Sequence, residues 1–391
     1  MATTAETYRA YKGAPLFAMG FRPFFFFASI WAGLATPLWI ASYLGWAPHF
    51  TRDWHVHEML FGYVAGVVAG FLLTAVPNWT GRLPVAGWPL AFLFSLWAMG
   101  RCAMLLEPAL GDWTRVIDSL FLLVLAAVVW REILAANNKR NLLICALVSV
   151  FAASNIVFHF QPWTPGGGLV AERIALAFIA MLIALVGGRI TPSFTRNWMA
   201  KRSMQPEPTP QDRCDIAALA LSALSLAIWV ATPASPLAGA ALVVSGVASF
   251  LRLIRWQGWR ATAEPLLLIL HIGYLWLGCA LILMGVAALA PSQIPASAGV
   301  HALTTGAVGV MTLAVMTRAT RGHTGRPLTA PWGTQMIYVL VNIGALARVT
   351  AALLPDAPPL LLASSAIAWS AAFALFAVLY APLLLAVRSR H

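Results

Sequence analysis

Long apolar runs, separated by short polar stretches, follow one another along the whole chain. A run of roughly 20 apolar residues is long enough to cross the hydrocarbon core of a membrane as a helix. We expect twelve such helices, at 21–44, 55–76, 86–106, 113–134, 141–160, 169–189, 214–233, 235–254, 265–290, 299–319, 331–354 and 359–386. The pattern therefore predicts an all-α polytopic membrane protein with about twelve transmembrane helices.

The composition agrees with this class, because 60% of the 391 residues are hydrophobic and only 10% are charged. Soluble domains carry about 25% charged residues. The longest polar stretch, 190–213, contains four prolines and divides the spans into six plus six. We treat residues 1–391 as a single membrane domain of twelve spans. No cleavable signal peptide is expected, since the first 20 residues lack an apolar core.

The basic charge of the chain is unevenly divided between the two ends of the predicted helices. When each of the 25 Lys and Arg residues is assigned to its nearest helix end, 20 fall on one side and 5 on the other. The positive-inside rule then places both termini and the 190–213 stretch in the cytoplasm. The net charge of +12 is thus explained by topology, and no nucleic-acid role is expected. The four cysteines show no C-x-x-C spacing, so we interpret them as packing residues.

An internal similarity links two distant spans. Residues 57–82 align without gaps on residues 301–326, with seven identical positions among 26. Both stretches begin with a histidine at a predicted outer helix end and finish with Thr-Gly-Arg. We therefore predict that spans two and ten are equivalent elements that face each other.

Histidines gather at one predicted depth. His57, His159 and His301 each lie roughly 12–14 Å outside the membrane midplane, judged from the rise of a helix per residue. Ionisable residues within spans are functional candidates by default, and neutral imidazole is a common haem and metal ligand. We predict that His57 and His301 hold one haem. Because that depth is partly hydrated, an interfacial histidine without any ligand is the alternative for each.

The segment His55-Val56-His57-Glu58 places three ionisable groups in four residues. Positions i and i+2 of a helix point about 200° apart, so His55 and His57 would serve two centres, or His55 would cap the helix. Glu58 is a catalytic candidate that could orient a ligating imidazole or pass protons. Its position in the first helical turn is equally explained by the helix dipole.

His271 differs from the outer histidines, since it falls about 6 Å on the inner side of its helix centre. Tyr274 lies one turn further along the same face, and we predict that it is catalytic by delivering protons or electrons. A buried polar pair without catalytic role is the alternative. His55, His159 and His271 are the metal-ligand candidates for a second centre, and His271 could instead lie on a proton path. Asp118, Asn155 and Asn342 are polar positions within spans to which the pattern assigns no role.

Six stretches resemble the NnrS family, and together they extend over nearly the whole chain. They read GFRPFF from Gly20, WHVHEMLFG from Trp54, GFLLTAVPNWTG from Gly70, GGRITP from Gly187, HALTTG from His301 and GHTGRP from Gly322. The resemblance implies a twelve-helix protein of the bacterial inner membrane that binds haem, is reported to contain copper, and is associated with nitric oxide metabolism and nitrosative stress. The motif histidines of the family correspond here to His55, His57, His271, His301 and His323.

The resemblance leads to one expected function and one alternative. We expect a haem protein, with haem of the b type and copper as a second cofactor, that reduces nitric oxide with electrons from an unidentified donor. The alternative is a non-catalytic membrane transporter, sensor or haem- and metal-handling protein. A transporter should carry substrate-binding charges near the midplane, where His271 is the nearest candidate.

Overall fold

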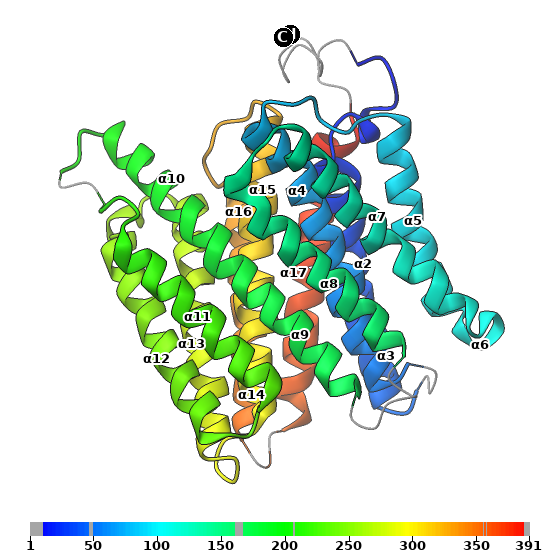
Figure 1. The fold of residues 1–391 in the computed structure, drawn as a ribbon, viewed down its shortest axis with the longest axis vertical. Helices are drawn as coiled ribbons and strands as arrows, with labels where there is room; N and C mark the ends of the chain where they lie inside the picture. Colours follow the sequence, from blue (N-terminus) through cyan, green and yellow to red (C-terminus); the bar gives the residue numbers. More distant parts are fainter. Residues whose placement is uncertain are drawn as a thin grey trace. The chain divides into compact units, whose positions relative to one another are not determined.

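The computed structural model describes residues 11–46, 50–160, 167–205, 208–354, 356 and 358–386. In these residues the chain is helical and has no strand (Figure 1), which confirms the predicted all-α class. Both termini lie outside the described residues, as do Arg9, Arg388 and Arg390 of the charge count. The cytoplasmic placement of the termini therefore stays a prediction.

Eleven helices of the described chain are long and apolar enough to cross a membrane. They are α2 (Phe21–Tyr43), α3 to α4 (Arg52–Thr80), α5 (Trp88–Leu105), α8 with the turn before it (Lys139–His159), α9 to α10 (Leu169–Ala200), α11 (Arg213–Ala231), α12 (Pro236–Arg255), α13 (Pro265–Leu289), α14 to α15 (Ala296–His323), α16 (Trp332–Leu353) and α17 (Pro359–Leu385). A multi-pass membrane protein is thus supported.

The predicted count of twelve spans is not confirmed. The remaining predicted span, 113–134, forms the helix α7 (Trp113–Ala135) of 23 residues. This helix carries four ionisable residues, Arg115, Asp118, Arg131 and Glu132, and it is not among the eleven apolar helices.

The predicted polar loop 190–213 is shorter than expected. The helix α10 (Gly188–Ala200) continues through the first part of it and contains Pro192. A proline removes one backbone hydrogen bond from a helix, and here it follows the π-helical segment η5 (Ile183–Gly187), in which the regular α-helical bonding has already been replaced. The helix therefore passes the proline and ends near Lys201.

The chain forms two compact units. Unit 1 comprises Met1–Ala175, Ala319–Arg326 and Phe373–His391, and unit 2 comprises Leu176–Arg318 and Pro327–Ala372. The boundaries fall within α9 (Gly167–Leu182), α15 (Gly309–His323) and α17. That the chain is a single membrane domain therefore stays a prediction.

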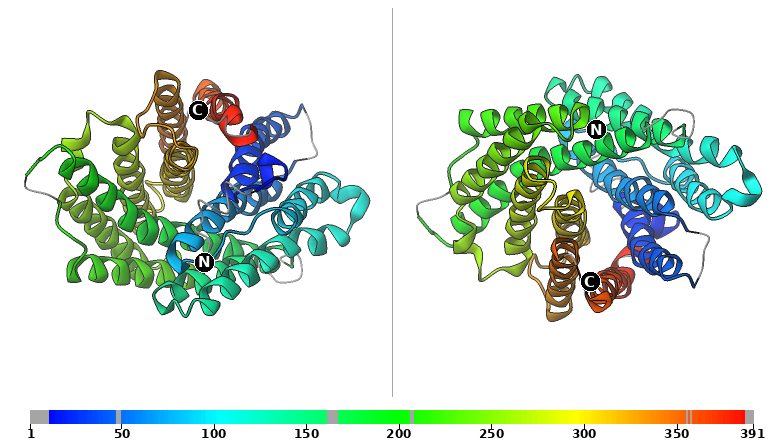
Figure 2. Two further views of the ribbon diagram at one scale, coloured as in Figure 1. Left: turned by 90° about the horizontal axis from the view of Figure 1, so that it is seen from above. Right: turned by 90° about the horizontal axis from the view of Figure 1, so that it is seen from below.

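Unit 1 is built from neighbouring helices near the start of the chain. In it α2 packs on α4 (Ala65–Thr80), α5 packs on α7, and α7 packs on α8 (Leu142–His159). Figure 2 shows these blue to blue-green helices next to one another, seen from both ends. The short elements η1 (Pro15–Phe17), α6 (Glu107–Leu110) and η3 (Lys139–Asn141) connect or precede them.

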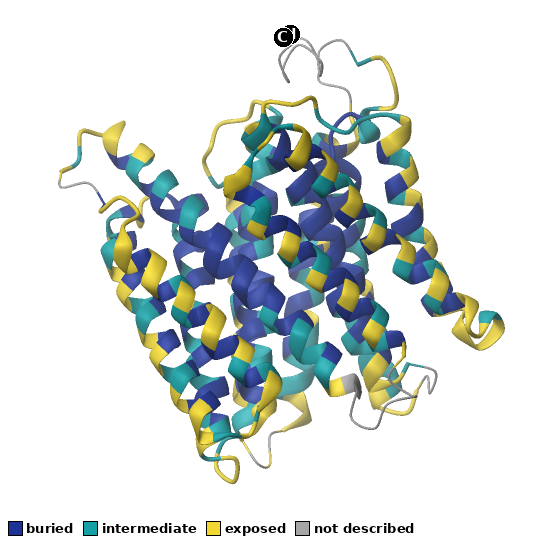
Figure 3. Cartoon of the chain, in the orientation of Figure 1, coloured by how far each residue is buried: buried dark blue, intermediate teal, exposed yellow. Residues whose placement is uncertain are grey.

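In unit 2, α12 packs on α13 through small residues. A Cβ atom at Gly239 would lie 2.9 Å from the carbonyl oxygen of Gly285, and one at Gly246 would lie 2.8 Å from that of Gly278. The buried residues of α12 are small or polar except for Leu242, whereas its large exposed side chains, Leu237, Val244, Val247, Leu251 and Ile254, are apolar. Figure 3 shows such exposed positions along the outer sides of α11 and α12. A helix more apolar outside than inside is typical of lipid contact.

The internal similarity found in the sequence is matched by the structure. The first copy consists of α3 (Arg52–His57), the π-helix η2 (Glu58–Val64) and α4, and the second of α14 (Ala296–His301), the π-helix η7 (Ala302–Val308) and α15. Each of the three elements of the second copy begins 244 residues after its counterpart in the first copy. Both copies end at a glycine in the left-handed conformation, Gly81 (φ 69°) and Gly325 (φ 71°), which is the usual helix C-terminal signal.

The side of the membrane on which the termini lie can be tested by reporter fusions. We expect a reporter fused after His391 to be active only if it functions in the cytoplasm, because 20 of 25 basic residues lie on that predicted side. Paired fusions of a cytoplasm-active and a periplasm-active reporter provide the measurement. Activity of the periplasmic reporter alone would contradict the predicted topology.

Candidate functional site

His57 and His55 both belong to α3, and they lie on different sides of it. The helix begins after Thr51, whose side chain accepts a hydrogen bond from the backbone of the first turn at 3.1 Å. The His57 side chain is fully buried. The His55 ring is partly exposed and stacks on Trp39, with 5.2 Å between the ring centroids. The two histidines thus belong to different environments, as their spacing predicts.

The ring of His57 lies between two carboxylates. Its Nδ1 is 2.9 Å from Oε1 of Glu58, and its Nε2 is 3.0 Å from Oδ2 of Asp118. The same Nε2 is 3.2 Å from Oδ1 of Asn155. Nε2 of His159 lies 2.9 Å from the same oxygen of Asp118. Two of the three histidines predicted at one depth therefore meet on a single carboxylate.

Arg101 joins the two carboxylates. Its Nη1 donates to Oε2 of Glu58 at 2.7 Å, and its Nη2 donates to Oδ1 of Asp118. All three side chains are buried, and buried charges persist only when they are paired. We name this set the His57 cluster, comprising His57, Glu58, Arg101, Asp118, Asn155 and His159.

The π-helix η2 begins at Glu58 and allows close approach to the cluster. A Cβ atom at Gly62 would lie 2.8 Å from Oε2 of Glu58 and 2.9 Å from Nε1 of Trp31. The carbonyl oxygen of Gly62 accepts a hydrogen bond from Nε1 of Trp97 at 2.9 Å. Single π-helical turns are common at functional sites, and here the glycine within the turn leaves room for the ion pairs.

The His57 cluster is suited to hold one additional positive charge. The two carboxylates, Glu58 and Asp118, exceed the single guanidinium of Arg101 by one negative charge. Both ring nitrogens of His57 face a carboxylate, and an ionised carboxylate accepts hydrogen bonds without donating any. A second proton on the His57 ring would balance the charge, and so would a divalent metal ion that also binds one hydroxide.

Three side chains of the cluster could hold a metal ion. One donor atom each from His57, Asp118 and His159 lie within 4.8 Å of one another. His159 was predicted as a metal-ligand candidate, and the structure brings it to His57 and Asp118. It does not bring His55 to this set, and His271 belongs to unit 2.

A second buried charged group lies in unit 2. Arg252 donates from Nε to Oδ1 of Asp215 at 2.9 Å, from Nη1 to the carbonyl oxygen of Ala184 at 3.2 Å, and from Nη1 to the hydroxyl of Tyr274. Ala184 lies in the π-helix η5. The Trp256 ring packs on Tyr274 with 4.5 Å between centroids. Tyr274 therefore lies in an arginine-carboxylate environment that its sequence spacing did not indicate.

His271 is buried one turn before Tyr274, and it has separate partners. Its Nε2 lies 2.9 Å from Oγ1 of Thr195, whose hydroxyl donates to the carbonyl oxygen of Thr191 at 2.8 Å. Since that hydroxyl has one proton, the His271 proton is on Nε2. Its Nδ1 is buried and has no partner among the described residues, and it lies against Gly258.

Haem ligation requires an imidazole nitrogen that faces the iron. In His301, Nδ1 donates to the carbonyl oxygen of Ser297 at 2.7 Å, which places the lone pair of the neutral ring on Nε2, as in many ligating histidines. Both nitrogens of His57 are instead engaged by the His57 cluster. The residues present would therefore allow His301 to hold a haem iron and would not allow His57 to do so in this arrangement. The predicted pairing of the two histidines joins residues of different units and stays a prediction. His323, the remaining motif histidine, stacks on Phe21.

Sequence reasoning missed five members of the two buried groups. Arg101 and Arg252 were counted only as topological charges, Asp118 and Asn155 were noted as polar residues without a role, and Asp215 was not considered. The available signal was their position, because a charge within or at the edge of an apolar run demands a partner. The apolar runs alone do not show which side chain pairs with each buried charge.

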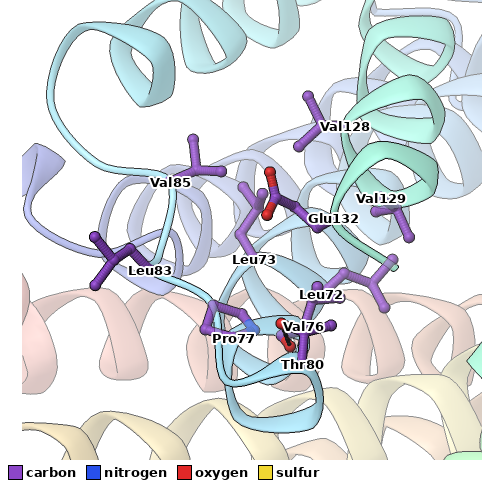
Figure 4. A pocket seen from close by; sticks show the side chains of 10 residues that line it. All are labelled: Leu72, Leu73, Val76, Pro77, Thr80, Leu83, Val85, Val128, Val129 and Glu132. Carbon is purple, nitrogen blue, oxygen red and sulfur yellow. Dashed lines mark hydrogen bonds between the residues drawn. The ribbon is translucent and has the colours of Figure 1, made fainter. Parts of the chain in front are cut away.

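The described chain also has an apolar pocket in unit 1, shown in Figure 4. It lies between α4, α7 and the segment that follows α4. Glu132 is the charged residue in its lining, and its carboxylate accepts from Nε of Arg82 at 2.5 Å. The remaining lining residues carry no group suited to acid-base or metal chemistry, so this pocket is not the candidate active site.

Comparison with known proteins supports the resemblance seen in the sequence. A protein-family model described as NnrS protein matches residues 15–388 of the 391-residue chain. The matched region includes the His57 cluster, the buried group of Arg252, Asp215 and Tyr274, and His301. No curated protein matches the chain. Because the family match covers nearly the entire sequence, the chain belongs to the NnrS family.

Proposed function

We propose that this protein binds haem in the bacterial inner membrane and acts in nitric oxide metabolism and in defence against nitrosative stress. The family match over residues 15–388 carries the proposal, since membership links the protein to the nitric oxide response in general. The finer part of the proposal is that the protein reduces nitric oxide at a haem or haem–metal centre. The bound haem, expected to be of the b type, would supply an iron that binds nitric oxide and accepts electrons. Copper is the second cofactor that we propose.

His301 is the residue that we propose as a haem ligand, because its Nδ1 is already held by a backbone carbonyl. This hydrogen bond fixes the ring orientation and raises the basicity of the other nitrogen. His55 and His271 remain candidates for a second centre. Nδ1 of His271 is the buried ring nitrogen without a partner among the described residues, which supports a ligand or acceptor role.

The reaction requires protons as well as electrons. Two molecules of nitric oxide, two electrons and two protons give nitrous oxide and water, with the electrons coming from a donor not yet identified. Glu58 is proposed as a proton-carrying residue, because its Oε1 lies 2.9 Å from Nδ1 of His57, a distance across which a proton can be exchanged. Tyr274 is proposed as a second proton or electron carrier in unit 2, where its hydroxyl contacts Arg252.

An optical spectrum of the full-length protein, purified in detergent, tests this function. We expect haem absorption bands in the oxidised protein, a shift on reduction with dithionite, and a further change when nitric oxide is added. His301→Ala should lose most of the bound haem or change its spectrum. Asp112→Asn, which alters an exposed side chain, should leave the haem unchanged. Consumption of nitric oxide with an artificial electron donor then measures turnover.

Two outcomes would contradict the proposal. Protein produced with ample haem that shows no haem bands would exclude the haem-binding part and favour the transporter or sensor alternative. Protein that binds haem and nitric oxide but produces no nitrous oxide would exclude the reductase part and favour a sensing or haem-handling role. His57→Ala tests the predicted pairing of His57 with His301 in the same assay. Loss of haem would support His57 as a second haem ligand, and unchanged haem would exclude that role.

A further inference from the structure

We propose that His57, Asp118 and His159 bind one divalent transition-metal ion, iron(II) or zinc, separately from any haem. The three side chains come from different helices, α3, α7 and α8, and all three are buried. Their donor atoms lie within 4.8 Å of one another. This site goes beyond the proposed function, because it requires neither haem nor a reaction with nitric oxide.

The distances are close to those of a metal-binding site. Oδ2 of Asp118 lies 3.0 Å from Nε2 of His57 and 2.9 Å from Nε2 of His159. Ligand atoms about 2.0–2.1 Å from a tetrahedral ion lie about 3.3 Å from each other. Both distances are therefore a few tenths of an ångström shorter than those around a bound ion, and the third pair of donor atoms, on His57 and His159, lies within 4.8 Å.

The surroundings of His57 are those of a ligating histidine. Its Nδ1 lies 2.9 Å from Oε1 of Glu58, which leaves Nε2 directed at Asp118 and His159. A carboxylate on the far nitrogen fixes the ring orientation and strengthens the ligand in many metal sites. Glu58 is itself held by Arg101 at 2.7 Å. The orienting carboxylate is thus fixed by a buried ion pair.

The charge of the group favours a cation. Asp118 and Glu58 together carry two negative charges, and Arg101 carries one positive charge. Neutral histidines would leave one negative charge buried without compensation, which is strongly unfavourable in an apolar interior. A divalent ion would change the net charge from −1 to +1, and one bound hydroxide would restore neutrality.

The donor atoms indicate which metals are favoured. Two imidazoles and one carboxylate are typical ligands of non-haem iron(II) and of catalytic zinc. Soft copper(I) prefers thiolates and thioethers, and none belongs to this donor set. Oδ1 of Asn155, 3.2 Å from Nε2 of His57, is available as a further oxygen ligand. Three protein ligands leave positions open for water or another small molecule.

A proton is the competing occupant of the same position. A His57 ring protonated on both nitrogens would satisfy both carboxylates without any metal. If a proton occupies the position, the protein should contain no metal there, and replacing His159 should matter little because a proton on His57 does not need a second imidazole. If a metal ion occupies it, metal should be bound and should be lost when His159 is replaced.

The experiment uses the full-length protein purified in detergent from cells supplied with iron and zinc. Metal content is measured by elemental analysis, and metal-depleted protein is then titrated with cobalt(II), a coloured substitute for zinc and iron(II). We expect about one ion per chain and visible cobalt absorption in the unaltered protein. His159→Gln and Asp118→Asn should reduce metal content at least tenfold. Glu58→Gln should weaken binding by about 10- to 100-fold, as for other residues that orient a ligand.

Asp112→Asn and His301→Ala are the controls. Asp112 is an exposed carboxylate, and His301 lies in unit 2, so both variants should keep the metal. Loss of haem with the metal retained in His301→Ala would separate this site from the haem proposal. If Asp118→Asn fails to fold, His159→Gln decides, since glutamine can still donate a hydrogen bond to Asp118.

Three results would overturn the proposal. The first is unaltered protein that contains no iron or zinc and takes up no cobalt, which would assign the position to a proton. The second is a folded His159→Gln variant with unchanged metal content. The third is binding of copper(I) alone with no uptake of cobalt(II), which would contradict the argument from the donor atoms.

Discussion

Arg101→Met is expected to destabilise the folded protein by about 3–5 kcal/mol, because removal of one partner leaves a buried charge uncompensated. Arg101 is the guanidinium that contacts both Glu58 and Asp118. Its loss leaves two carboxylates close together in a buried site with no positive charge except that of a protonated His57 or a bound metal. Thermal unfolding in detergent, monitored by circular dichroism and by recovery of monodisperse protein, measures the effect.

Arg131→Met is the matched control for this change. Arg131 also pairs with a carboxylate, that of Glu132 at 2.7 Å, but its side chain is 65% exposed. Exposed ion pairs contribute about 0–1 kcal/mol, so this variant should unfold close to the unaltered protein. A triple variant that combines Arg101→Met with Glu58→Gln and Asp118→Asn should recover much of the lost stability. Equal losses in the two arginine variants would show that the buried ion pairs do not support the fold.

Gly62→Ala is expected to cost about 1–3 kcal/mol, the usual range for overfilling a packed interior. The added methyl group would lie 2.8 Å from Oε2 of Glu58 and 2.9 Å from Nε1 of Trp31. It would also press on the Arg101 guanidinium. The same unfolding measurement applies, and any metal or haem bound by the variant should fall together with its stability.

Gly187→Ala is the control, since this glycine also lies in a π-helical segment, η5. A Cβ atom there would meet Cε of Met311 at 3.3 Å and Cδ2 of Tyr274 at 3.6 Å. The methionine end can move aside, and alanine favours the helix by up to about 1 kcal/mol relative to glycine. We therefore expect little change. A large loss for Gly187→Ala with none for Gly62→Ala would contradict the steric argument.

The helical architecture could be predicted from apolar run lengths because a membrane span must satisfy its own backbone hydrogen bonds. Eleven of the predicted runs became apolar helices of spanning length. The run at 113–134 became a helix with a buried Asp118, and hydropathy did not show whether its charges face lipid or protein. The predicted polar loop 190–213 was partly wrong, because α10 continues past Pro192 to Ala200.

The candidate site could be predicted only in part. Helical rise placed His57 and His159 at one depth, and the structure shows them on the same carboxylate. The depth estimate did not reveal Arg101, Asp118 or Asn155 as the partners of these histidines, because depth along a span says nothing about the rotation of a side chain around the helix axis. The partners of His57 depend on which faces of α5, α7 and α8 turn inward, and these faces are set by packing between the helices.

The paired π-helical segments also set the rotation between the two parts of a span. Each segment directly follows a histidine, His57 or His301, and precedes a regular helix, α4 or α15. A π-helical turn commonly accommodates one extra residue within an α-helix, and one residue corresponds to about 100° around the helix axis. Shortening η2 by one residue would thus turn His57 by about a quarter of a circle relative to α4, away from Asp118. In both copies, the π-helical segment sets the direction in which the imidazole points relative to the following helix, while the chemistry of histidine determines what it can bind.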